Sequence, residues 1–182
     1  NGPIPTFTFG PTVLPNLTAT QRTWVKPAQS PVLASAQEAA SAVETQNAEY
    51  LEMRSSTSPW MPEINQPGDI YIYEIHLVIS MELLWQYGWC ATTEDVLAQN
   101  FEQMTVEFRL NGATVEQDYI AVGEYQREDG GYCRTFTALV TDWPAGLHQL
   151  ESRVTFSRPT DDGWSLYPAG THTFKFFVDV DQ

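Results

Sequence analysis

Residues 71–89 read YIYEIHLVISMELLWQYGW, and every odd-numbered position of this stretch is apolar. The even-numbered positions include the polar residues Glu74, His76 and Gln86. An alternation with a period of two predicts β-structure with one buried face. At about 3.3 Å per residue the stretch would extend about 60 Å, which is too long for one strand of a small domain. We therefore expect a bend or bulge near residues 80–84, or a strand that crosses between two sheets.

The same alternation returns later in the chain, at residues 104–110, 132–140, 149–156 and 171–180. Asn111-Gly112 follows the first of these stretches, and Asn-Gly is the preferred dipeptide of a type I′ hairpin turn. We expect residues 113–122 to form the return strand of that hairpin. Short strands in succession, without alternating helices, predict a β-sandwich.

Two other segments have helical signals. Ser30 followed by Pro31 is typical of a helix start, and the chain from there to about Met53 is rich in Ala, Gln and Glu. We expect one helix in this region, docked on the surface of a larger body and followed by a linker. Residues 92–95 predict the cap of a second, short helix that continues to about Met104.

A short internal repeat precedes two of the predicted strands. Residues 143–148 read WPAGLH, and residues 167–172 read YPAGTH. In each copy Pro takes the second position of a turn and Gly takes a position that tolerates positive φ. This aromatic-Pro-x-Gly turn resembles those of bacterial immunoglobulin-like and fibronectin-like sandwiches. The resemblance implies an all-β, immunoglobulin-like β-sandwich of seven to nine strands over residues 69–182. The composition of the preceding residues predicts an extended arm at 1–31 and the helix and linker at 32–68.

The composition restricts the classes of partner. The chain is 42% hydrophobic, which is enough for a packed core, and its net charge is −14. A sequence this acidic repels phosphate backbones and anionic membranes, so nucleic-acid binding is not expected. The most apolar stretch contains Glu74 and Glu82, and two carboxylates within a span argue against a membrane helix.

Proline and threonine are interleaved through residues 1–31, which predicts extended or polyproline backbone without a core of its own. Such segments resemble the stalks that follow the lipid anchor of bacterial surface lipoproteins. The resemblance implies an exported protein, extracellular or at the cell surface, in a processed form whose precursor carries an anchor. Thr6-Phe7-Thr8-Phe9 also alternates with a period of two. We expect residues 4–10, with Ile4, Phe7 and Phe9, to add as a strand to a sheet edge of the same chain or of a neighbouring subunit.

The two cysteines, Cys90 and Cys133, lie near the ends of predicted strands. In an exported protein they predict a disulfide, and the alternative is two buried free thiols. No Cys/His spacing typical of a metal site, no phosphate-binding glycine motif and no nucleophile elbow is present, so we predict no cofactor, no metal and no catalytic residue. The histidines, His76, His148 and His172, are expected to be structural.

The predicted loops suggest two kinds of ligand. Trp143, Trp164 and Tyr167 lie in loops near aspartates such as Asp162, which predicts a platform on which sugar rings stack. The alternative is that Trp143 and Tyr167 plug the ends of the sandwich. Asp161-Asp162-Gly163 is the best carboxylate cluster, and it is either a hairpin turn, a surface calcium site or part of a glycosidase site.

These patterns favour a non-catalytic structural or interaction module of an extracellular or cell-surface assembly. Its expected partner is another protein or a further copy of the chain. A carbohydrate-binding module is the first alternative. A small secreted hydrolase with a carboxylate site is the second.

Overall fold

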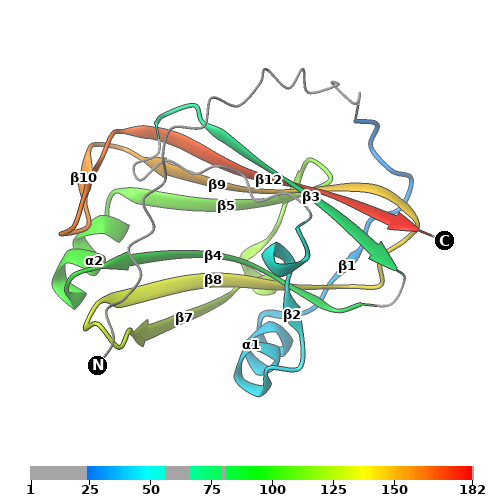
Figure 1. Cartoon of the computed structure of the whole chain (residues 1–182), viewed down its shortest axis with the longest axis horizontal. Coiled ribbons are helices and arrows are strands. Elements are labelled where there is room, and N and C mark those ends of the chain that lie inside the picture. Colours follow the sequence, from blue (N-terminus) through cyan, green and yellow to red (C-terminus); the bar gives the residue numbers. More distant parts are fainter. Residues whose placement is uncertain (1–23, 56–65, 79–80, 182) are drawn as a thin grey trace, which may run out of the picture.

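The computed structural model describes residues 24–55, 66–78 and 81–181, and most of them belong to two β-sheets that face each other (Figure 1). The first sheet has the order β3-β12-β9-β5-β6, with bounds Ile70–Val78, Gly170–Asp181, Gly146–Phe156, Met104–Leu110 and Ala113–Thr114. The second has the order β1-β8-β4-β2, with β7 also beside β8; the bounds are Val32–Leu33, Tyr132–Thr141, Leu83–Ala91, Glu49–Tyr50 and Ala121–Gln126.

Helices and short turns fill the connections. They are α1 (Ala36–Thr45), α2 (Glu94–Phe101), the 3-10 helices η1 (Leu51–Arg54) and η2 (Gln117–Tyr119), and the hairpin β10 (Thr160–Asp161) with β11 (Leu166–Tyr167). In Figure 1, α1 lies below the second sheet, and α2 lies with β10 at one end of the molecule. No helix of the described residues is long and apolar enough to span a membrane. The predicted arm with Ile4, Phe7 and Phe9 lies outside the described residues.

The long alternating stretch is divided between the two sheets, as its length predicts. β3 ends at Val78 and β4 begins at Leu83. β3 pairs with β12 in parallel, whereas β4 pairs with β8 in the antiparallel direction. The alternation continues across the break because both strands turn their odd-numbered residues toward the shared interior.

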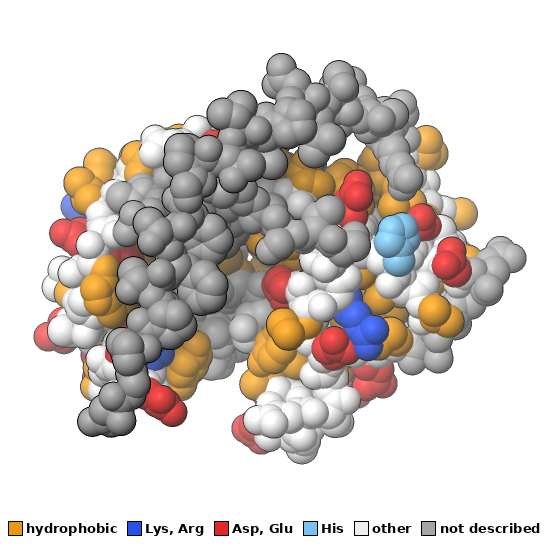
Figure 2. All heavy atoms as spheres, viewed as in Figure 1, with side chains coloured by type: hydrophobic (Ala, Val, Ile, Leu, Met, Phe, Trp, Pro, Cys, Tyr) orange, Lys and Arg blue, Asp and Glu red, His pale blue; other side chains and the backbone are white. Residues whose placement is uncertain are grey.

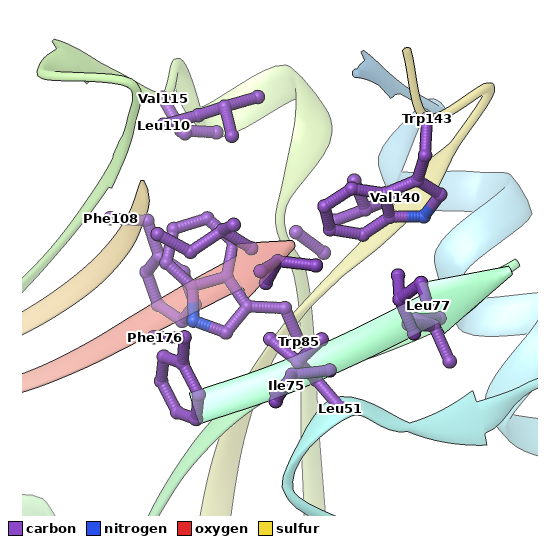
Figure 3. Close-up of a cluster of buried hydrophobic side chains, with 14 of the residues drawn as sticks. Leu51, Ile75, Leu77, Trp85, Phe108, Leu110, Val115, Val140, Trp143 and Phe176 are labelled. Atoms are coloured by element: carbon purple, nitrogen blue, oxygen red, sulfur yellow. The ribbon is translucent and has the colours of Figure 1, made fainter. Parts of the chain in front are cut away.

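The largest core cluster lies between the sheets and centres on Trp85 (Figure 3). Trp85 is fully buried, and its ring meets that of Phe108 edge-on at 4.5 Å between centroids. Its indole Nε1 donates a hydrogen bond to Ser152 Oγ at 3.0 Å, so the only polar atom of the side chain is paired. Burying an aromatic side chain of this kind contributes about 2–3 kcal/mol. β4, β5 and β9 are therefore joined through one side chain.

The long helix expected to begin near Ser30 and run to Met53 is wrong. α1 begins after Ser35, whose hydroxyl accepts the backbone N–H of Glu38 while Glu38 bonds back to the Ser35 N–H. Residues 32–33 pair with β8 as β1, and residues 49–50 pair with β4 as β2. Sheet pairing satisfies the backbone at both flanks and leaves only a short helix between them. The second predicted helix is confirmed as α2, which begins after Thr93 and ends earlier than expected, at Phe101.

The hairpin prediction is correct at its turn and wrong in its return strand. Asn111 and Gly112 have φ of 49° and 81°, and both residues of a type I′ turn need positive φ. The return strand β6 has only two residues, after which the chain crosses to the other sheet and forms β7. Val115 and Ile120 are both buried in the main core. Their burial draws residues 115–120 across the gap between the sheets and ends the hairpin.

The two copies of the repeat start β9 and β12, as predicted. Gly146 and Gly170 are the first residues of these strands and have φ of 120° and 138°. Because β9 and β12 are antiparallel neighbours, the copies lie at opposite ends of the sandwich. Trp143 of the first copy is buried in the main core (Figure 3), and Tyr167 of the second packs against Trp89 at 4.8 Å between centroids. Both aromatic residues thus plug the ends.

A half-buried carboxylate closes part of the edge of β4. Glu52 of η1 forms a hydrogen bond with the backbone of Gln86, beyond the two-residue pairing with β2. Burial raises the pKa of Glu52 from 4.5 to about 7, and hydrogen bonds from its own backbone and that of Gln86 oppose the rise only partly. The fold therefore favours the neutral acid at this edge.

Replacing both cysteines by alanine should destabilise the protein. Cys90 and Cys133 form a disulfide between directly paired residues of β4 and β8, which confirms the sequence prediction. They are 43 positions apart, and closing a loop of that length stabilises by about 4 kcal/mol in the chain-entropy model. Urea unfolding of wild type and of Cys90→Ala/Cys133→Ala measures the difference. A loss below about 1 kcal/mol would show that the disulfide does not stabilise the sandwich.

Glu52→Gln should change how stability depends on pH. The folded-state pKa lies above the unfolded value, so the folded form holds the proton more tightly and loses stability as pH rises from 4.5 toward about 7. Glutamine resembles the neutral acid. We expect Glu52→Gln to gain roughly 1–3 kcal/mol over wild type at about pH 8 relative to about pH 5, measured by thermal unfolding. Glu44→Gln, at an exposed position of α1, is the matched control; equal behaviour of the two variants would refute this role of Glu52.

Candidate interaction surface

Three connections meet at the end of the sandwich that carries α2 and β10 (Figure 1). They are residues 92–103 between β4 and β5, residues 127–131 between β7 and β8, and residues 157–169 between β9 and β12. We call this region the three-loop end. It contains the predicted ligand residues Trp164, Asp162 and Tyr167.

The first and third connections are held together by hydrogen bonds. The backbone N–H of Thr92 donates to the carbonyl of Asp162 at 2.8 Å. The side-chain amide of Asn100, on α2, donates to the carbonyl of Asp161 at 2.9 Å. Its other atom, Oδ1, accepts the indole N–H of Trp89 at 2.8 Å. Asn100 is buried, and this pairing ties β10 to α2 and to the core of β4.

The aspartates of the third connection shape the turn. Asp162 is only 5% exposed, and its Oδ1 accepts the backbone N–H groups of Trp164 and Ser165, each at 2.7 Å. Asp161 Oδ1 accepts the N–H of Gly163 at 2.8 Å. These are Asx-type contacts that fix a tight turn, which is the hairpin alternative of the sequence analysis. Among the described residues, His, Cys, Asp and Glu form no group of three that could hold a metal ion, so the calcium alternative has no site there.

Trp164 projects from this fixed turn into solvent. Its side chain is 52% exposed, and the guanidinium of Arg127, from the second connection, lies 5.9 Å from the ring centroid. Gly131 lies beneath the ring, where a Cβ atom would come within 2.8 Å of Cη2 of Trp164. Arg127 is held in turn by Asp129, with 2.7 Å between Nη2 and Oδ2. The indole is therefore presented on a pre-formed surface made by two connections.

Exposed apolar and acidic side chains both occur on the three connections and the strands next to them. Leu166 and Tyr125 are more than half exposed, at 59% and 53%. The three connections also carry exposed carboxylates, at Glu94, Asp95, Glu102, Glu128, Asp129 and Asp161. The face of the molecule in Figure 2 likewise shows more acidic than basic side chains. This end therefore presents an exposed indole among mostly acidic side chains.

The structure separates the residues predicted for a glycan platform. Trp143 is 3% exposed at the opposite end of the sandwich, so it contributes to no surface around Trp164. Tyr167 is half-buried, with its ring against Trp89 and Phe156. Of the predicted loop aromatics only Trp164 is exposed. Sequence reasoning missed Arg127 and Gly131, whose sole signal is a Gly-rich turn before β8.

Two of the three histidines are buried in the sandwich, and the third lies on its surface. His148 is fully buried, with Nε2 at 2.7 Å from the carbonyl oxygen of Pro144 and Nδ1 at 3.2 Å from Asn111 Nδ2. His172 is buried against Phe156, and burial lowers the pKa of its imidazole. His76 lies on the outer face of β3, 3.9 Å from an oxygen of Asp179.

A shallow hollow of about 490 Å³ lies elsewhere, between α1, β1 and the end of β8. Its lining includes Ser35, Glu38, Leu139 and Thr141. The carboxylate of Glu38 is occupied by the capping contacts of α1, and those hydrogen bonds lower its pKa. Ser41, Asn47 and Glu82 also line the hollow, so its walls are largely polar, whereas small-molecule sites are mostly apolar.

Alanine at position 163 should loosen the three-loop end. Gly163 has a φ of 89°, and a Cβ atom there would lie 2.0 Å from Thr92 Oγ1. Gly112 is a matched control, because its φ is 81° and a Cβ atom would meet nothing within 4 Å. We expect Gly112→Ala to cost about 1 kcal/mol and Gly163→Ala about 2 kcal/mol or more, by urea unfolding. Equal losses would mean that the contact with Thr92 does not hold the connections together.

Comparisons with known proteins give only distant structural likenesses. No protein-family model and no curated protein matches the chain. One matching solved chain comes from the structure of PbICP-C in complex with falcipain-2, with a TM-score of 0.38 and 9% identity, over 66% of this chain and 96% of that chain. Another is the cysteine protease inhibitor EhICP2 from Entamoeba histolytica, with a TM-score of 0.34 and 10% identity, over 66% of this chain and 100% of that chain. Both TM-scores lie below 0.5, so these likenesses assign the chain neither a family nor a function.

Proposed function

We propose that this chain is a non-catalytic interaction module that binds a protein partner at its three-loop end. The observation that carries the proposal is the exposed indole of Trp164 on a turn fixed by Asp162 and flanked by Arg127. Tryptophan and arginine are enriched among the residues that dominate binding energy at protein interfaces. A side chain that is already held in place loses little conformational entropy when a partner closes over it.

The charge of the surface favours one class of partner. The exposed carboxylates of the three connections outnumber their exposed cations, Arg127 and Arg158. Complementary charge speeds association and disfavours partners of the same sign. The partner is therefore a protein with a basic rim around an apolar pocket.

The strand order supports an immunoglobulin-like assignment of the sandwich. With β3, β4, β5, β6, β7, β8, β9 and β12 labelled A, B, C, C′, D, E, F and G, strands B, E and D are neighbours in one sheet and C, F and G in the other. That grouping is typical of immunoglobulin domains, whose B–C and F–G loops form the binding end of variable domains. The disulfide departs from the antibody pattern, because Cys90 and Cys133 join strands B and E.

Two features support an extracellular or cell-surface location. The disulfide between Cys90 and Cys133 is of the kind that persists in oxidising compartments. The Pro/Thr-rich segment at residues 1–31 resembles a lipoprotein stalk. In this proposal the three-loop end faces the partner.

Two alternatives remain from the sequence. A carbohydrate-binding module could use Trp164 for stacking, although Trp143 and Tyr167 do not join it on the surface. A hydrolase would need free carboxylates, whereas Asp161 and Asp162 accept backbone N–H groups of the turn. The protein-partner proposal uses the groups that the surface presents.

Selection of peptides from a random library displayed on phage tests the proposal. The immobilised wild-type protein should enrich peptides that combine basic and apolar residues. Because hot-spot residues dominate such contacts, Trp164→Ala should weaken their binding by about tenfold or more, measured by biolayer interferometry. Val78→Ala removes an apolar side chain of β3 that is even more exposed, at 76%, and should leave binding unchanged.

Other outcomes would replace the proposal. Selected peptides that bind Trp164→Ala as tightly as wild type would remove the three-loop end from the interaction. Binding on a glycan array that is lost in Trp164→Ala, with no peptide enriched, would establish the carbohydrate alternative. Turnover of a sugar or ester substrate would contradict a non-catalytic role.

A further inference from the structure

The edge strand β7 is unusually open. Five of its six residues, Val122 to Gln126, are exposed, and β7 pairs with β8 along one side only. It contains no proline and no lysine, the residues that most often protect an edge from pairing. Val122 and Tyr125, which point to opposite sides of the strand, are 55% and 53% exposed.

Val122 is on the inward face of the sheet but is only partly covered by other side chains. This residue lies directly opposite Phe136 in the β7–β8 register, so both side chains lie on the same face of the sheet. Phe136 packs against the main core cluster and lies 5.7 Å from the ring of Phe101. Val122 therefore faces the interior and is nonetheless more than half exposed. One more strand beside β7 would bury it.

Glu124 is the next residue of β7 whose side chain lies on the same face as Val122, and this position is not open. Glu124 accepts a hydrogen bond from Arg134 Nε at 2.6 Å, and the guanidinium of Arg134 lies 4.3 Å from the centroid of Phe101. These two residues cover the core toward the three-loop end. An added strand thus meets an apolar position at Val122 and a closed, charged position at Glu124.

Other edges of the sandwich have protection that β7 lacks. Beyond β2, the backbone of β4 meets the carboxylate of Glu52. Ser55 forms an antiparallel bridge with Ile75 on β3. The end of β5 is paired with β6. Such protection limits strand addition, whereas among the described residues no strand pairs with the outer side of β7.

We propose that residues 4–10 of the chain's own arm add to β7 as an edge strand. Thr6-Phe7-Thr8-Phe9 would place both phenylalanines on the inward face of the added strand, one of them beside Val122, and both threonines toward solvent. Residues 1–21 carry no charged side chain, so the segment meets no repulsion from an acidic protein. Pro5 is tolerated in an outermost strand, where its missing N–H faces water.

Chain length and concentration favour the arm of the same molecule. The 13 residues between Gly10 and Trp24 reach up to about 45 Å, which is enough to span a domain of this size. A tethered segment has an effective concentration in the millimolar range, far above that of a second copy in dilute solution. Backbone hydrogen bonds between the arm and β7 provide the affinity, and burial of the phenylalanine side chains determines which residues of the two strands pair. This contact is separate from partner binding at Trp164.

Cysteine cross-linking in the full chain tests the proposal. The native cysteines are paired in the disulfide, so any additional cross-link comes from the introduced cysteines. Val122→Cys is combined with Phe7→Cys, with Phe9→Cys or, as the matched control, with Thr8→Cys. We expect oxidation to link position 122 to position 7 or 9, within a monomer on non-reducing gels, at about tenfold or greater yield than to position 8. Equal yields, or no cross-link from either phenylalanine position, would overturn the proposal, and a cross-linked dimer would assign the edge to the arm of a second copy instead.

Hydrogen exchange gives a second readout. Deletion of residues 1–10 should speed exchange of the outward-facing β7 amides by about tenfold or more, because they lose their partners. Amides of the central strand β12 are the internal control and should not change. Unchanged exchange in β7 would also overturn the proposal, whatever the result of the peptide selection at Trp164.

Discussion

The structure depends on the burial of Trp85 between two sheets. Its ring packs on Phe108 of one sheet while its own strand, β4, belongs to the other, and its indole N–H reaches Ser152 on β9. A shift of β4 by one residue would move Trp85 to the outer face and leave Ser152 without this partner. The register of β4, and with it the pairing of Cys90 and Cys133 on the same strand pair, is therefore set from the core outward.

The fixed register also holds the three-loop end in place. Trp89 lies on β4 four residues beyond Trp85 and bonds to Asn100, which in turn bonds to the backbone of β10. Movement of β10 relative to α2 would leave the buried side-chain amide of Asn100 without this partner, at a cost of about 1–3 kcal/mol. A surface that rests on such bonds keeps its shape before a partner arrives.

The sequence predicts what depends on period and turn chemistry, and it fails where distant segments compete. The alternation of residues 71–89, the Asn111-Gly112 turn and the repeated strand starts are local signals, and the structure contains them. The helix start at Ser35 and the early end of β6 are decided by pairing with β8 and by burial between the sheets. The role of Trp164 depends on Arg127 and Gly131, which lie more than thirty positions away and carry no periodic signal.

Connection length explains why one end of the sandwich is closed and the other presents an indole. Between β8 and β9 only residues 142–145 are available, so Trp143 has no room to turn outward and fills the end of the core. Between β9 and β12 the connection spans residues 157–169 and forms its own hairpin. Tyr167 then fills the corresponding end of the core, and the turn before it carries a second aromatic residue, Trp164. Because the core is already closed without it, the exposure of Trp164 costs the sandwich no packing, and its position is free to serve a partner.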